Sequence, residues 1–178
     1  QGAVFTSSSL IEDHGPEHVD DKSPKTYWKT SLTQAKSFPV WIQIDFVKPV
    51  QIFSYHISRT ESIEESPAFF RLVGYTSRAA NRKTDLTADN ENVGVTLDER
   101  VLQGSASLKT IADGGTHYCV YPNHHGQLIK RVRLNIFRVF GQTDENAARR
   151  GVSVALSRFF ITTHEEEEES LGSCSDRR

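Results

Sequence analysis

The chain has 178 residues, which suits one compact domain with tails and is long enough to bury one sizeable core. Its formal net charge is −2, but residues 164–178 carry six acids and two bases, so the rest has 19 Lys and Arg against 17 Asp and Glu, or +2. This weak balance argues against a nucleic-acid-binding domain, which needs a clearly basic face. The apolar runs are strand-sized, far shorter than the roughly 20 residues of a membrane-spanning helix, so no membrane span is expected.

The chain begins with a polar segment, residues 1–18, in which a strand at Ala3–Thr6 and a short helix at Pro16–Val19 are the regular candidates. Seven or eight strand-like segments follow, separated by turn residues. They are WIQIDF (41–46), VQIFSYHISR (50–59), FFRLVGYTS (69–77), VGVTLDERVL (93–102), HYCVYP (117–122), IKRVRLNIFRVF (129–140) and VSVALSRFFITT (152–163). No segment of helical length has a 3.6-residue period, so we expect an all-β fold, an antiparallel β-sandwich or jelly roll.

Two of these strands alternate clearly between two faces. In the first, we expect Ile52, Ser54, His56 and Ser58 on one face and Phe53, Tyr55 and Ile57 on the other. In the second, Ile129, Val132, Leu134 and Ile136 face one way and Arg131, Arg133 and Asn135 the other.

Polar inserts at residues 77–92 and 141–151 separate strands and are places where a sandwich carries its function. The tail, residues 164–178, contains a block of five Glu and is expected to be disordered. We therefore divide the chain into a partly packed N-terminal segment (1–18), a sandwich (19–163) and an acidic tail (164–178).

Several motifs resemble, in order and spacing, those of the discoidin family, the coagulation factor V/VIII type C or galactose-binding-like domains. They are Asp21-Lys22-Ser23-Pro24-Lys25-Thr26-Tyr27-Trp28, Trp41-Ile42-Gln43-Ile44-Asp45-Phe46, Pro67–Leu72, Arg131–Leu134 and Ala155–Phe160. The resemblance runs from about residue 3 to residue 163 and implies the same β-sandwich. Trp28 and Trp41 are expected to plug the core and brace the loop between them, with Asp45 in a structural role.

The resemblance also suggests a calcium site, because many members bind calcium in an Asp-Gly-Asp loop closed by a Glu of the final strand. Here Asp20 and Asp21 remain as candidate ligands, but Lys22, Ser23 and Arg158 stand at the other positions. Because calcium needs six to eight oxygen ligands, we favour a solvated turn or an Asp21–Arg158 ion pair over a metal site. No other cofactor is expected.

The two cysteines lie in different surroundings, Cys119 in an apolar strand and Cys174 in the tail. We expect Cys119 to be a buried thiol rather than a nucleophile or half of a disulfide framework. His117, His124 and His125 lie near it, but without a recognised zinc spacing. No catalytic motif is present, so the chain is not expected to be an enzyme. The absence of a disulfide pattern and of glycosylation sequons favours an intracellular location.

Binding residues are expected on the loops at one end of the sandwich. By family geometry, the Arg59–Pro67 loop, the Lys29–Pro39 loop and the Asn123–Gly126 turn should gather there. The candidate ligand residues are Tyr27, Lys29, Arg59, Glu61, Glu64, Glu65, His124 and His125. Ser66-Pro67 also resembles a segment of the Doc branch of the superfamily, found in ubiquitin-ligase components. A merely solvated rim is the alternative.

A basic string, Lys130, Arg131 and Arg133, alternates with core residues and is expected to form an exposed strand face, neutralised by Glu165–Glu169 of the tail. It lacks the interleaved aromatics of a single-strand-binding surface. The main functional hypothesis is a protein–protein interaction module of a larger intracellular assembly. A carbohydrate-binding module is the alternative, and a Doc-type subunit or a DNA-binding domain is less favoured. The missing disulfide favours the first hypothesis, whereas an exposed sugar-stacking aromatic at the loop end would favour the second.

Overall fold

The computed structural model describes residues 2–21, 23, 25–33, 37–76, 94–103, 115–142 and 151–163. The insert 77–92, most of the insert 141–151 and the acidic tail 164–178 lie outside these residues. Within the described ranges, no helix is both long and apolar enough to cross a membrane.

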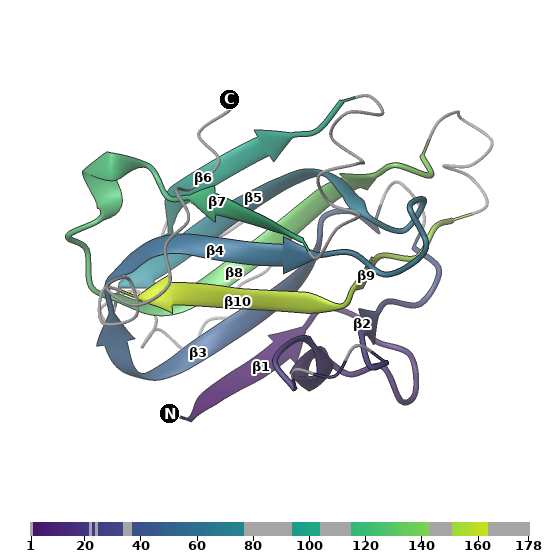
Figure 1. Cartoon of the computed structure of the whole chain (residues 1–178), viewed down its shortest axis with the longest axis horizontal. Helices are drawn as coiled ribbons and strands as arrows, with labels where there is room; N and C mark the ends of the chain where they lie inside the picture. The colour runs from purple at the N-terminus through teal and green to yellow at the C-terminus, as the bar shows by residue number, and fades with distance from the viewer. Residues whose placement is uncertain are drawn as a thin grey trace.

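The described residues form ten strands, and the expected all-β antiparallel fold is confirmed (Figure 1). The larger sheet has the order β1 (Ala3–Ser7), β3 (Val40–Val50), β8 (Ile129–Val139), β5 (Pro67–Thr76) and β6 (Val95–Val101). The smaller sheet has the order β10 (Arg158–Thr163), β4 (Ile52–Ser58) and β7 (Thr116–Cys119). A short pair, β2 (Trp28–Lys29) with β9 (Ala155–Leu156), and two 3₁₀ turns, η1 (Pro16–Val19) and η4 (Pro122–His124), complete the fold.

The N-terminal segment contributes directly to the larger sheet. The expected strand at Ala3–Thr6 is present as β1, which pairs with β3 from Ala3 opposite Phe46 to Ser7 opposite Ile42. The segment is thus an edge strand, and η1 follows it where a short helix was expected.

The core forms where the inward residues of the two sheets meet. In β8 the predicted alternation is confirmed, because Val132, Leu134 and Ile136 are fully buried. Trp28 is also fully buried, as expected, and its indole Nε1 donates to the Ser9 carbonyl at 3.1 Å. Each large side chain buried in this way stabilises the fold by about 1.5–3 kcal/mol.

Trp41 does not plug the core, so the prediction for this residue is wrong. In β3 it is Val40, Ile42 and Ile44 that face inward, which turns Trp41 outward, opposite Asn135 of β8. There the Arg133 guanidinium lies 4.1 Å from the centre of the indole ring. The alternating sequence 41–46 allowed either set to face the core, and the β-branched residues occupy it.

The alternation predicted for β4 is interrupted once. Ser54, His56 and Ser58 share the outer face, but Ile52 lies in the core with Tyr55 and Ile57 rather than with the serines. The register shifts there, because Thr162 pairs with Ser54 while Thr163 pairs with Ile52. A bulge of this kind changes which face the following residues occupy.

Asp98 joins the two sheets through a buried polar contact. It lies opposite the core residue Leu72, so its fully buried carboxylate faces inward. Its Oδ2 accepts hydrogen bonds from the Tyr55 hydroxyl and from Arg100 Nε, both at 2.7 Å. Burial, and then the negative charge of Asp98, raise the pKa of Tyr55 well above its ordinary value, so its hydroxyl stays a donor. Arg100 also lies 5.2 Å from the ring centre of Tyr118 on the facing sheet.

Candidate functional site

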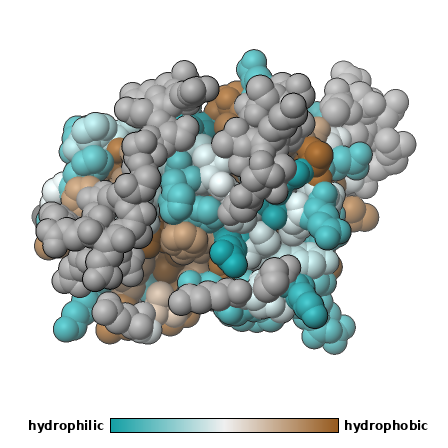
Figure 2. Space-filling model, in the orientation of Figure 1, coloured by the Kyte–Doolittle hydropathy of each residue, from teal (hydrophilic) through white to brown (hydrophobic). Residues whose placement is uncertain are grey.

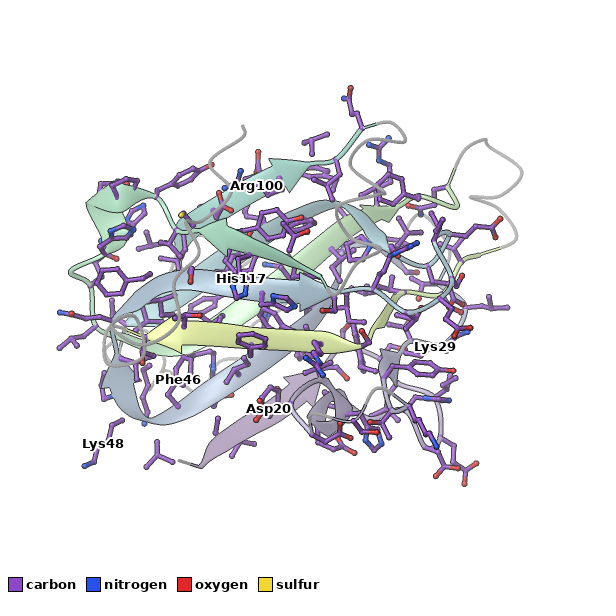
Figure 3. All side chains as sticks on the ribbon, viewed as in Figure 1. Asp20, Lys29, Phe46, Lys48, Arg100 and His117 are labelled. Atoms are coloured by element: carbon purple, nitrogen blue, oxygen red, sulfur yellow. The ribbon has the colours of Figure 1, made fainter. Side chains whose placement is uncertain are left out.

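The sandwich has two ends that differ in how their polar groups are used. We call the end where β4 finishes, with Lys29, Arg59–Ser66 and Ser157, the Arg59 end. We call the opposite end, where β3 meets β4 and where η4 lies, the His124 end. Figure 3 shows Lys29 at one end and Lys48 at the other. The seven residues of β4 between them span about 20 Å.

The predicted gathering of three loops at one end is therefore only partly correct. Lys29 and the Arg59–Pro67 loop do meet, because Lys29 Nζ lies 2.6 Å from Glu65 Oε1. His124 and His125 lie at the opposite end. They follow β7, which runs antiparallel to β4 and so ends beside its start, where Val120 N donates to the Phe53 carbonyl at 2.9 Å.

The histidines at the His124 end are occupied by their own turn. His125 Nε2 lies 3.0 Å from the Val120 carbonyl, and its ring packs 4.9 Å from that of Phe53. The two ring nitrogens of His124 contact the amide groups of Gln127 at 3.1 Å and Asn123 at 3.3 Å. These contacts favour a role in shaping the turn.

The Arg59 end is held by backbone hydrogen bonds between segments far apart in sequence. Ala155 N donates to the Glu65 carbonyl at 3.1 Å, and Thr30 N donates to the Val154 carbonyl at 2.9 Å. On the other side of the same loop, Gly141 N donates to the Glu64 carbonyl at 2.8 Å. The loop backbone is thus fixed at several points, which suits a preformed binding surface.

Two side-chain donors at the Arg59 end are not used by the fold. Arg59 Nη1 and Thr60 Oγ1 are buried, and neither has a hydrogen-bond partner among the described residues. The backbone of Arg59 is fixed nonetheless, because Ser157 Oγ donates to its carbonyl at 2.7 Å. Since a buried unsatisfied donor costs about 1–3 kcal/mol, the pair marks a place where a partner group is missing.

The segments that meet at this end also carry exposed apolar side chains and an aromatic ring. Leu32 is 71% exposed and Ile63 is 40% exposed. Tyr27 and Lys29 lie on the same side of β2 because Trp28 between them points into the core. The half-buried ring of Tyr27 stacks on His14 with a centroid distance of 4.2 Å. In Figure 2 the right-hand end of the molecule has teal and white surface with isolated brown side chains.

The remaining predicted ligand residues also lie at this end. Glu61 and Glu64 are exposed, whereas Glu65 is half-buried and paired with Lys29. Six of the eight predicted binding residues are therefore on the Arg59 end or in β2 and its approach: Tyr27, Lys29, Arg59, Glu61, Glu64 and Glu65. Thr60 was missed, and its position beside Arg59 in a polar loop was the available signal.

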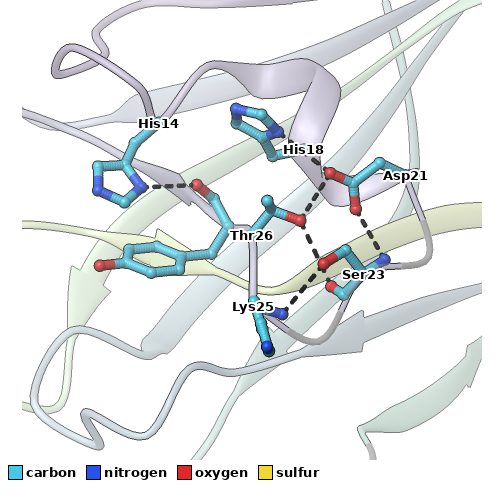
Figure 4. A network of polar contacts seen from close by, with 7 residues as sticks. His14, His18, Asp21, Ser23, Lys25 and Thr26 are labelled. Carbon is cyan, nitrogen blue, oxygen red and sulfur yellow. Dashed lines mark hydrogen bonds and ion pairs between the residues drawn. The ribbon is translucent and has the colours of Figure 1, made fainter.

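Asp21 organises a turn (Figure 4). Its Oδ1 accepts from Ser23 N at 2.9 Å, and its Oδ2 accepts from Thr26 Oγ1 at 2.6 Å and lies 3.1 Å from His18 Nδ1. The hydrogen bond from Thr26 is the main reason why the pKa of Asp21 is lowered. Of the two predicted alternatives, a solvated turn or an Asp21–Arg158 ion pair, these contacts match the turn.

These contacts bear on the predicted metal sites. Asp20 is exposed after η1, and both oxygens of Asp21 already have donors. In the part of the chain that the structure describes, no group of three or more His, Cys, Asp or Glu side chains is arranged to hold a metal ion. Calcium at Asp20 and Asp21 stays a prediction that this geometry does not favour.

Cys119 is disulfide-bonded, so the prediction of a buried free thiol is wrong. The chain has one other cysteine, Cys174, which lies outside the described residues. His117 is exposed and packs instead against His56, 4.5 Å away between ring centres. The considered zinc ligands His117, Cys119, His124 and His125 are therefore not brought together.

The expected exposed basic face is only partly present, because Arg131 is paired with an acid and Arg133 is buried. Asp45 accepts from Arg131, while Lys130 donates to the Val47 carbonyl. Arg133 is buried and donates to Gln43 Oε1 from Nε at 3.0 Å and from Nη2 at 2.7 Å. Burial lowers the pKa of Arg133. Asp45 thus has the structural role expected of it. The predicted neutralisation by the tail falls on residues outside the described ranges and stays a prediction.

Solved structures share this architecture. CpGH89CBM32-5 from Clostridium perfringens, in complex with GalNAc-β-1,3-galactose, has a TM-score of 0.61 and 10% identity over 90% of this chain and 95% of that chain. Chitosan-binding module 2 of a chitosanase/glucanase from Paenibacillus sp. IK-5, in complex with chitotriose, has a TM-score of 0.61 and 12% identity over 89% and 94%. The F5/8 type C domain of a Bacteroides fragilis protein has a TM-score of 0.58 and 11% identity over 90% of each.

The chain therefore has the discoidin-like, galactose-binding-like β-sandwich fold that the sequence motifs resembled. The Doc-type hypothesis gains no support from these structures. No protein-family model and no curated protein matches the sequence. At these identities the likeness establishes the fold and leaves the ligand to be argued from the site.

Proposed function

We propose that this sandwich is a non-catalytic module that binds carbohydrate at its Arg59 end. The observation that carries the proposal is the pair of unused buried donors, Arg59 Nη1 and Thr60 Oγ1, in a loop that also exposes Ile63. A sugar offers hydroxyl oxygens that accept from such donors and C–H faces that pack on apolar or aromatic groups.

Two discriminating features now favour sugar over the protein partner that the sequence first indicated. The argument for a protein partner used the missing disulfide, and Cys119 is disulfide-bonded. The argument for a sugar asked for an aromatic ring at the loop end, and Tyr27 supplies a half-exposed one, backed by His14. The disulfide also removes one reason for an intracellular location, which stays a prediction.

The likeness to glycan-bound modules adds support to the proposal. CpGH89CBM32-5 holds GalNAc-β-1,3-galactose and the Paenibacillus module holds chitotriose, so this architecture accommodates quite different sugars. Because one fold hosts many functions, the site residues rather than the fold must decide the ligand.

The test is a glycan array probed with the full chain, followed by titration calorimetry on the best ligand. We expect Arg59→Ala and Tyr27→Ala to weaken binding by about tenfold or more, since each removes a central contact. His124→Ala, at the opposite end, is the matched control and should change affinity by less than about twofold. Absence of binding to any glycan, with a lysate protein captured through the Arg59–Ser66 loop instead, would overturn the proposal in favour of a protein partner.

A further inference from the structure

We propose that the glycan recognised at the Arg59 end is acidic, carrying a carboxylate that pairs with the Arg59 guanidinium. This inference rests on the proposed carbohydrate-binding function and specifies its ligand class. Its basis is a half-buried arginine at the end of a strand that has no counter-charge among the described residues, with a second, exposed arginine on the neighbouring strand.

Three arginines of the larger sheet lie beside acidic side chains, whereas Arg133 donates to the neutral Gln43. Arg71 Nε lies 2.8 Å from Glu99 Oε2, and Arg100 Nε lies 2.7 Å from Asp98 Oδ2. Arg131 is likewise paired with an acid of the neighbouring strand. Arg59 makes no such ion pair with a described residue, although one of its guanidinium nitrogens is removed from water.

An uncompensated buried charge is costly because it loses hydration without gaining an opposite charge. A neutral sugar hydroxyl would accept the hydrogen bond but would leave the charge uncompensated. A carboxylate accepts the hydrogen bond and also compensates the charge, and its two oxygens match the planar fork of a guanidinium. The buried hydroxyl of Thr60 supplies a further donor for the same group.

Arg158 extends the positive charge onto the neighbouring strand. It is exposed and pairs in register with Ser58, the residue before Arg59. Among the acids of the loop, Glu65 is bound to Lys29, and Glu61 and Glu64 are exposed. The two arginines therefore favour binding of an anion where the end of β4 lies beside the start of β10.

The experiment compares trigalacturonic acid with neutral galactotriose by titration calorimetry, using the full chain at low and at physiological salt. We expect tighter binding of the uronate, weakened by salt. Arg59→Gln should bind the uronate with about tenfold or more lower affinity. Arg59→Lys should recover only part of that affinity, because lysine lacks the planar, forked donors of a guanidinium. Arg158→Gln should weaken the uronate by a smaller factor of about threefold.

Lys48→Gln removes an exposed cation at the His124 end and is the matched control, with a change below about twofold. Equal, Arg59-dependent binding of both trisaccharides would overturn the acidic-ligand inference and leave the carbohydrate proposal intact. Failure to bind either trisaccharide or any acidic glycan, while neutral glycans bind on the array, would also overturn the inference. Failure with every glycan would overturn both proposals.

Discussion

Removing one hydroxyl, in Tyr55→Phe, tests whether the Asp98 carboxylate ties the two sheets together. The hydroxyl donates to Asp98 Oδ2 at 2.7 Å, inside the core, where Tyr55 and Asp98 are both fully buried. Asp98 Oδ1 has no hydrogen-bond partner among the described residues, so the variant leaves Arg100 as the carboxylate's main described donor. A hydrogen bond to a charged group is worth about 1.5–3 kcal/mol, and we expect the free energy of unfolding to fall by about 2 kcal/mol.

Asp98→Asn should cost more, about 3–5 kcal/mol, because it leaves the buried Arg100 guanidinium without its counter-charge. The assay is urea unfolding followed by far-ultraviolet circular dichroism, with the midpoint read at an unchanged slope. Tyr27→Phe is the control, expected within about 0.5 kcal/mol, because its half-exposed ring lies outside the core. A loss of unfolding free energy below about 0.5 kcal/mol for Tyr55→Phe would refute the idea that this hydrogen bond links the two sheets. So would a double variant whose loss equals the sum of the losses of Tyr55→Phe and Asp98→Asn.

Two further outcomes follow from polar contacts outside the core. The lowered pKa of Asp21 means that its contribution to stability is present above the unfolded pKa, about 3.9, and is lost as pH falls through the lower folded value. The melting-temperature difference between wild type and Asp21→Ala should therefore be constant from pH 7 to about 5 and shrink below that, and a difference that grows on acidification would contradict this. Arg133→Lys should cost about 1–2 kcal/mol, because lysine cannot both fork onto Gln43 and stack on Trp41. The control is Arg138→Lys at an exposed position, which should change the free energy of unfolding in urea very little. An equal loss of stability in both variants would contradict the role assigned to the contacts of Arg133 with Gln43 and Trp41.

The architecture could be predicted because alternation in the longer strands leaves little freedom. In β8, three arginine or asparagine positions alternate with large apolar residues, and only one face of such a strand can enter a core. The turn residues and the order of the motifs then specify an antiparallel sandwich. Trp28 was expected in the core for a different reason, because the motif around it resembles that of the discoidin family and large aromatic residues usually fill β cores.

Where a strand offers two acceptable faces, the sequence alone does not decide. Trp41 alternates with Ile42 and Ile44, and the isoleucines take the core because they pair in register with inward residues of β8. The bulge opposite Thr163 is also invisible to a simple period of two, and it moves Ile52 to the inner face.

The site was partly predictable for a topological reason. Residues within one loop, such as Arg59 and Glu65, stay together whatever the sheet order, so their common end follows from the sequence. Placing His124 required knowing the direction of β7 beside β4, which no local pattern encodes. Asp98 gave no signal of its own, because a carboxylate in an alternating strand normally faces water.

The two tryptophans place spectroscopic reporters in separate layers of the molecule. Trp28 is fully enclosed, whereas Trp41 lies outside the larger sheet beneath the Arg133 guanidinium. Emission from the enclosed indole should be blue-shifted and insensitive to iodide, while the outer indole should be red-shifted and open to the quencher. Replacing each in turn with phenylalanine would assign the two signals, so that loosening of the outer sheet face can be timed separately from opening of the core.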